Sequence, residues 1–138
     1  MELLAVTPGA ITLPQLRRIA RGTQGVALAG GWRADAEAAV AAVAARLDAG
    51  EALYGINTGF GRLAKTRIPP DELARLQLYI VRSHAAGVGE PLADSTVRLV
   101  LALKAASLAR GYSGVRPVIV ERLLALLNAG VLPRVPSQ

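Results

Sequence analysis

Cysteine is absent from this 138-residue chain, and His84 is its one histidine. Such a chain cannot be a disulfide-stabilised scaffold or a structural zinc module, because both need clustered cysteine or histidine side chains. Aromatic residues make up 4% of the chain, whereas 26 residues are alanine and 21 are leucine. This composition favours helices over a β-sandwich, which needs more β-branched and aromatic residues. The 52% of hydrophobic residues and 19% of charged residues also exclude a disordered chain.

Long hydrophobic runs are also missing, and a membrane span needs about 18 apolar residues in succession. The most apolar stretch, residues 97–109, is interrupted by Arg98 and Lys104. The sequence starts without the basic segment of a signal peptide, so we expect a soluble, cytoplasmic protein that engages no membrane. The net charge is +6, but the 14 arginines are spread over nearly every segment. Because nucleic-acid binding usually needs a clustered basic face, we expect no nucleic-acid partner.

The sequence predicts a mainly α fold. Apolar periodicity, proline at helix starts and glycine at helix ends predict five helices that cover about half of the chain. Their predicted ranges are 12–21, 32–49, 69–86, 94–110 and 117–129. Two short apolar runs, residues 3–6 and 26–29, could pair as a two-stranded sheet.

Several helix boundaries and faces can be read in more detail. Thr12 and Gln15 have the spacing of a capping box, and Gly22 is a natural helix end. Asp94 or Ser95 is expected to cap the fourth helix, whose apolar residues surround its axis and predict burial on most sides. In the second helix one apolar stripe is expected to pack inward, formed by Ala36, Val40, Val43 and Leu47.

A glycine-rich loop follows Tyr54. Three glycines occur within residues 55–61, which indicates unusual backbone angles or a close approach to another group. The spacing is poor for a phosphate-binding loop. Two interpretations remain: a tight structural loop, or a mobile segment that presents the Tyr54 phenol. A phenol titrates near pH 10, so a tyrosine that acts as a base at neutral pH needs nearby positive charge or aligned backbone N–H groups.

His84 lies near the end of the third predicted helix, directly after Ser83. It could be a hydrogen-bonded histidine at a helix end or part of a site. A metal site built from this chain alone is not expected, because no second histidine and no cysteine is present. No catalytic triad can be assigned from spacing either.

Four blocks together resemble the aromatic amino acid ammonia-lyase family. The first is the tyrosine–glycine loop, with Tyr54, Gly55, Asn57, Thr58, Gly59, Phe60 and Gly61. Leu76-Gln77 and Ser83 to Gly89 match the next block, residues 104–116 match a third, and residues 131–136 fit a fourth. The blocks occur in the family's order, and the resemblance spans nearly the whole chain.

The resemblance implies a large helical tetramer that uses no external cofactor. In this family an Ala-Ser-Gly tripeptide cyclises into methylidene-imidazolone, an electrophile that activates the substrate amine. Tyr54 matches the tyrosine taken as the base, and residues 55–61 match its active-site loop. Ser83 and His84 match the substrate-selecting position of the members that act on L-histidine. Those members release ammonia and trans-urocanate, whereas relatives that use phenylalanine or tyrosine carry other residues there.

The Ala-Ser-Gly tripeptide does not occur in these 138 residues. We therefore expect residues 1–110 to be an N-terminal globular segment with the loop, and residues 111–138 to start a central helical domain, truncated before the electrophile precursor. Such a fragment would be inactive alone and would need the remainder of the polypeptide. The alternatives are a segment of a phenylalanine or tyrosine lyase or an aminomutase, and a non-catalytic helical interaction module.

Overall fold

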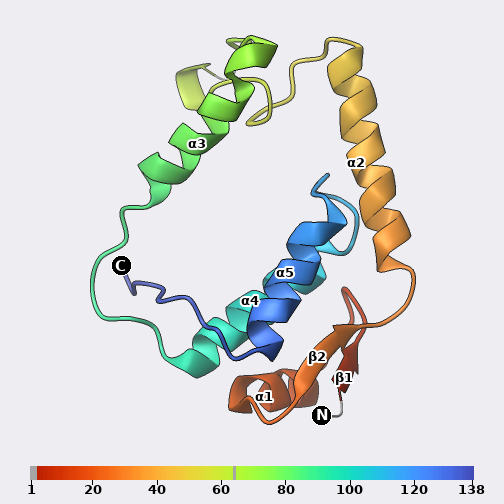
Figure 1. The fold of residues 1–138 in the computed structure, drawn as a ribbon, viewed down its shortest axis with the longest axis vertical. Helices are drawn as coiled ribbons and strands as arrows, with labels where there is room; N and C mark the ends of the chain where they lie inside the picture. The colour runs from red at the N-terminus through yellow and green to blue at the C-terminus, as the bar shows by residue number, and fades with distance from the viewer. Residues whose placement is uncertain (1–2, 64) are drawn as a thin grey trace.

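The computed structural model describes residues 3–63 and 65–138 and has the expected mainly α architecture (Figure 1). These described residues form five α-helices and two short strands, together with 3-10 turns at Gly61–Leu63 and Pro70–Glu72. In chain order the elements are β1 Leu3–Val6, α1 Leu13–Arg21, β2 Gly25–Leu28, α2 Trp32–Asp48, α3 Leu73–His84, α4 Asp94–Leu108 and α5 Pro117–Asn128. Among the described residues no helix is both long and apolar enough to cross a membrane.

The two strands form a parallel pair, in which Leu3 lies opposite Gly25 and Val6 opposite Leu28. The predicted pairing is confirmed, although β2 begins one residue earlier than expected. Parallel strands need a crossover, and α1 provides it. The predicted capping box of α1 is also present: the Thr12 side chain accepts from the Gln15 N–H, and the Gln15 side chain accepts from the Thr12 N–H. Gly22 ends the helix in a left-handed conformation.

The hydrophobic core lies where α4 and α5 pack together over the strand pair and α1 (Figure 1). Its buried side chains come from all of these elements and include Val6, Ile19, Val97, Leu101 and Leu127. The side-chain amide of Asn128 fixes α5 to the edge of β2. Its Nδ2 donates to the Val26 carbonyl at 2.9 Å, and its Oδ1 accepts from the Val26 N–H at 2.7 Å.

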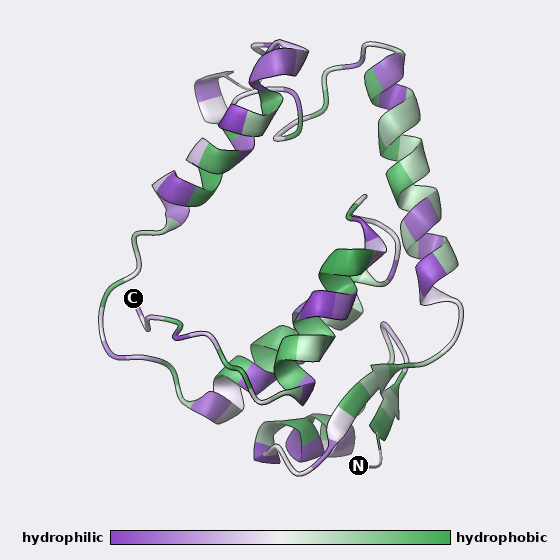
Figure 2. Ribbon diagram, viewed as in Figure 1, coloured by the Kyte–Doolittle hydropathy of each residue, from purple (hydrophilic) through white to green (hydrophobic). Residues whose placement is uncertain are grey.

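Helices α2 and α3 extend away from this core (Figure 1). Ala36 is the buried member of the predicted α2 stripe, and Val40, Val43 and Leu47 are half-buried. Helix α3 has no fully buried residue. Apolar residues dominate α4 and α5, whereas α3 alternates polar and apolar positions (Figure 2). The predicted burial of α4 on most sides is not reached within this chain, since Val100 and Leu103 are each 46% exposed.

Several predicted boundaries were wrong, including the start of the third helix, which was predicted at residue 69 but lies at Leu73, after the 3-10 turn Pro70–Glu72. The N-cap of α4 is Ala93, without a side-chain hydrogen bond, and Asp94 occupies the first turn, where its charge suits the positive helix end. Helix α4 ends at Leu108, two residues early, and α3 ends at His84. The chain cannot stay helical after His84, because residues 88–92 form backbone hydrogen bonds with residues 135–138 instead. The predicted domain boundary at residue 110 lies between α4 and α5 and stays a prediction.

Candidate active site

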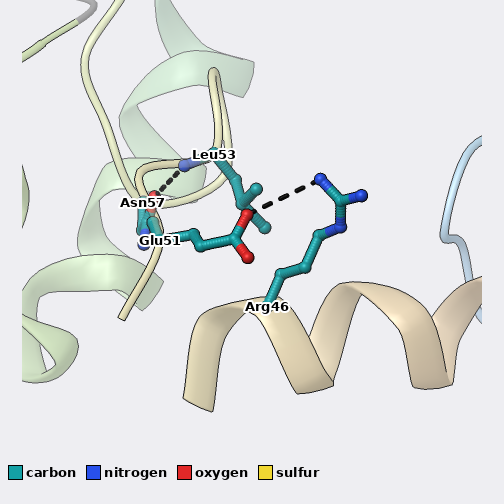
Figure 3. A network of polar contacts seen from close by, with 4 residues as sticks. All are labelled: Arg46, Glu51, Leu53 and Asn57. Carbon is teal, nitrogen blue, oxygen red and sulfur yellow. Dashed lines mark hydrogen bonds and ion pairs between the residues drawn. The ribbon is translucent and has the colours of Figure 1, made fainter. Parts of the chain in front are cut away.

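The glycine-rich loop lies between α2 and α3, at the end of the molecule away from the core (Figure 1). Asn57 holds the segment that precedes Tyr54 (Figure 3). Its Oδ1 accepts from the Leu53 N–H at 2.7 Å, and its Nδ2 donates to the Glu51 carbonyl at 2.8 Å. The Glu51 carboxylate lies 3.6 Å from the Arg46 guanidinium and so joins this segment to the last turn of α2.

Thr58 holds the other side of Tyr54. It is the one fully buried polar side chain in the described part of the molecule. Its hydroxyl accepts from the Gly55 N–H at 3.2 Å and donates to the Gly59 carbonyl at 3.0 Å. The Thr58 backbone also forms an isolated antiparallel bridge with Arg67. Asn57 and Thr58 therefore fix the backbone on both sides of Tyr54 and leave its side chain free.

Phe60 explains why glycine occupies position 55. Gly55 has φ +72°, and a Cβ built there would lie 3.1 Å from Cε1 of the Phe60 ring. A side chain at position 55 would therefore be strained and would also displace the ring. This close approach lets the loop fold back on itself, so that Phe60 lies beside Tyr54.

Three aromatic rings form a row on the surface, with Phe60 between Tyr54 and His84. The Tyr54 and Phe60 centroids are 5.4 Å apart in an edge-to-face arrangement. The Phe60 and His84 centroids are 6.4 Å apart with a tilt of 59°. Tyr54 is 64% exposed, so its hydroxyl is accessible to a ligand. The structure therefore brings together two residues that are 30 positions apart in the sequence.

The hydrogen bonds of His84 determine which of its ring nitrogens is free. Nδ1 lies 2.8 Å from the Ile80 carbonyl oxygen. Because a carbonyl can only accept, this bond requires the proton on Nδ1 and leaves the Nε2 lone pair available in the neutral ring. The Ser83 hydroxyl donates to the same carbonyl at 3.0 Å and lies 3.2 Å from Nδ1. Ser83 thus helps to orient the imidazole, while Nε2 can accept a hydrogen bond from a ligand.

Gln77 also contributes to the site, although the sequence marks it only as part of a matching block. Its Nε2 donates to the Gly55 carbonyl at 3.3 Å, which links the loop to α3. Its presence in the second matching block, beside Leu76, was the available signal. That block does not indicate that the side chain reaches 22 positions back to the loop.

The segment after His84 is paired with the last residues of the chain. Val88 and Gln138 exchange two backbone hydrogen bonds, at 2.6 and 3.0 Å, and Leu92 donates to the Val135 carbonyl at 2.8 Å. A Cβ built at Gly87 would lie 2.8 Å from the Pro136 ring. Glycine is therefore required at position 87 for this close approach, which places Gln138 near the end of α3.

The arrangement suits acid–base chemistry on a small ligand. It offers an exposed phenol and an exposed imidazole, whose rings both lie beside the Phe60 ring. The described residues contain no cluster of three His, Cys, Asp or Glu side chains that could hold a metal ion.

Comparison with known proteins agrees with the four matching blocks. Residues 11–138 match the family model described as aromatic amino acid lyase. A histidine ammonia-lyase from Burkholderia pseudomallei is 54% identical over 134 residues, which cover 97% of this chain and 26% of that protein. The chain thus spans about a quarter of the length of the curated relatives that it matches.

Solved structures of related enzymes have the same fold as this chain. The histidine ammonia-lyase of Trypanosoma cruzi superposes with a TM-score of 0.84 at 36% identity and covers 99% of this chain, which spans 26% of it. A tyrosine aminomutase from Streptomyces globisporus superposes with a TM-score of 0.88 at 31% identity, covering 96% of this chain and 26% of its own. The family model, the identity across almost the whole chain and the shared fold agree, and the chain belongs to the aromatic amino acid lyase family.

Proposed function

We propose that the protein containing these residues is a histidine ammonia-lyase, which converts L-histidine to trans-urocanate and ammonia in histidine degradation. The observation that carries the proposal is the row of Tyr54, Phe60 and His84. One end of the row presents a hydroxyl and the other an imidazole nitrogen that can accept a hydrogen bond. The 54% identity to a histidine ammonia-lyase supports the same substrate.

In the proposed reaction Tyr54 acts as the base that removes a proton from the β-carbon of histidine. The electrons of that C–H bond form the Cα–Cβ double bond, and the C–N bond breaks to release ammonia. The Nε2 lone pair of His84 accepts a hydrogen bond from the substrate imidazole N–H and orients the ring. Ser83 supports His84 in that orientation through the shared Ile80 carbonyl. Residues 55–61 position the phenol and exclude water when the substrate is bound.

The family's methylidene-imidazolone supplies an electrophile that activates the amine as a leaving group. Its Ala-Ser-Gly precursor is not among the 138 residues. The residues present fit such a group, because the exposed Tyr54 and His84 side chains leave room for a substrate between this chain and further polypeptide. We therefore propose that the remainder of the polypeptide supplies the group and that no external cofactor is needed.

The assembly is part of the same proposal. We infer a homotetramer in the cytoplasm that contacts neither a membrane nor nucleic acid, with residues 1–110 as the globular segment and residues 111–138 as the start of the central helical domain. Exposed apolar side chains on α4 and α5, including Leu103, Ile119 and Leu126, support burial by further polypeptide. Sedimentation of the complete gene product should give four subunits, and a monomer would contradict this assembly.

An aminomutase is the second candidate, because the tyrosine aminomutase of Streptomyces globisporus shares this fold at 31% identity. An assay of the complete gene product with L-histidine, L-tyrosine and L-phenylalanine separates the candidates. We expect urocanate absorbance from histidine alone. A β-amino acid from tyrosine would favour the aminomutase, and no product from any of the three would favour a non-catalytic helical module.

We expect His84→Leu to lower kcat/KM for L-histidine by about tenfold, the usual effect of one lost hydrogen bond to a ligand. The apolar side chain should also improve the use of L-phenylalanine relative to L-histidine. Steady-state kinetics with both substrates measure the change.

His84→Gln is the matched control, because its side-chain oxygen can still accept a hydrogen bond. We expect it to recover part of the lost kcat/KM for histidine. An unchanged substrate profile in His84→Leu would remove His84 from substrate selection.

A further inference from the structure

The Tyr54 loop has internal order but few attachments to the rest of the molecule. Asn57 and Thr58 fix the peptide groups on either side of Tyr54 with bonds that stay inside residues 51–59. An open surface cavity of about 410 Å³ lies beside the loop, lined by Ile56, by Val43 of α2, by Leu73 and Gln77 of α3 and by residues 113–115. The loop is therefore preformed, yet loosely packed against its surroundings.

Gln77 bridges the edge of this cavity. Its Nε2 donates to the carbonyl of Gly55, the residue directly after Tyr54. Within residues 3–63 and 65–138, no other side-chain hydrogen bond joins the loop residues 54–61 to α3. Packing of Phe60 against His84 provides a second, non-directional contact. The orientation of the Gly55 peptide group relative to α3 thus depends on the Gln77 amide.

Helix α3 carries both Gln77, which makes this hydrogen bond, and His84, the proposed substrate contact. Gln77 and His84 are seven residues apart, two turns of the helix, so they lie on the same side with a rise of about 10.5 Å between them. Gln77 binds the Gly55 carbonyl at one end of these two turns, and the His84 imidazole lies at the other end. A rigid helix therefore sets the distance between the attachment of the phenol-bearing loop and the substrate contact.

We propose that Gln77 is a positioning residue, which holds the Tyr54 loop at a fixed distance from His84 through its hydrogen bond to the Gly55 carbonyl. The proposal rests on the function inferred above. In this role Gln77 acts through the loop and needs no contact with substrate or electrophile. Its hydrogen bond fixes the position of the base, Tyr54, relative to the substrate contact, His84. Proton removal then starts from a defined arrangement of these two residues.

The test compares Gln77→Met and Gln77→Glu with the unaltered protein, all expressed as the complete gene product. Methionine keeps the length of the side chain but donates no hydrogen bond. Glutamate keeps the shape and directs an acceptor at the Gly55 carbonyl. We expect kcat for histidine to fall about 3- to 10-fold in Gln77→Met and further in Gln77→Glu, because one hydrogen bond to the loop is lost and then replaced by repulsion. KM should change less than kcat, since His84 is untouched.

Two further measurements separate positioning from simple destabilisation. Amide hydrogen exchange should become faster in residues 54–61 of both variants, while exchange in α4 and α5 stays unchanged. Gln24→Met is the control, because it makes the same substitution at a glutamine far from the loop and removes the hydrogen bond that Gln24 accepts from the Arg18 guanidinium. It should match the Tm of Gln77→Met but keep full turnover.

Equal kcat in Gln77→Met and the unaltered protein, or unchanged exchange in the loop, would overturn the proposal. A kcat loss in Gln24→Met as large as in Gln77→Met would also overturn it. If the unaltered protein formed no urocanate, the proposed function would fail, whereas loop exchange would still report whether Gln77 holds the loop.

Discussion

Tyr54→Phe should reduce the turnover of L-histidine by about 10²- to 10⁴-fold, the usual contribution of a positioned general base. The substitution removes one hydroxyl and keeps the ring, so the edge-to-face contact with Phe60 should persist. The Tyr54 side chain is 64% exposed and has no hydrogen-bond partner among the described residues, so its loss should leave folding unaffected. Urocanate formation under saturating histidine measures the effect, and the sedimentation profile should not change.

The control is Tyr112→Phe. Tyr112 is also highly exposed, and its ring packs beside the Arg110 guanidinium, a contact that phenylalanine preserves. We expect nearly normal turnover in this variant. Near-normal turnover in Tyr54→Phe would instead exclude Tyr54 as the base, whatever the behaviour of the control.

Gly111→Ala should destabilise the chain by about 2–5 kcal/mol, because it combines a strained backbone with a steric clash. Gly111 has φ +74°, and a Cβ built there would lie 2.6 Å from the carbonyl oxygen of Asp35. That oxygen belongs to the backbone of α2 and cannot rotate away as a flexible side chain could. The substitution should therefore separate the turn after α4 from the first turns of α2.

Gly130→Ala isolates the conformational part of this effect, so the difference between the two variants gives the steric part. Gly130 follows α5 with a similar angle, φ +68°, but nothing lies within 4 Å of a Cβ built there. We expect it to cost about 1 kcal/mol, the conformational part alone. Thermal unfolding of both variants measures the difference, and equal losses of stability would contradict a close approach of α2 at Gly111.

The site depends both on interactions between residues that are close in the sequence and on interactions between residues that are far apart in it. Asn57 and Thr58 hold the loop through groups no more than six residues away, so the loop keeps its shape independently of the core. By contrast, the alignment of Phe60 with His84 requires α3 to lie beside the loop. Exposure of Tyr54 leaves the proposed reaction centre open to water within this chain. Further polypeptide over the aromatic row would exclude that water and strengthen each polar contact.

Local signals in the sequence predicted the secondary structure well because their causes are local. The capping box of Thr12 and Gln15 closes within one helical turn, and the left-handed glycine at position 22 ends α1 without help from other elements. Pro117 begins α5 for a similar reason, since proline fits the first helical turn. The predicted caps Asp94 and Ser95 failed, because the pairing of residues 88–92 with residues 135–138 fixes where the chain enters α4.

The sequence by itself determined the helical class of the fold, the family, and the choice of Tyr54, Ser83 and His84 as candidates, because composition, periodicity and ordered motifs are properties of the chain. The tertiary structure decided which of these residues meet. It placed Phe60 between Tyr54 and His84, bound the Nδ1 of His84 to the Ile80 carbonyl, and brought Gln77 to the Gly55 carbonyl. The contacts of Gly55 with Gln77 and of Phe60 with His84 depend on how α3 packs beside the loop, and no local pattern encodes that geometry.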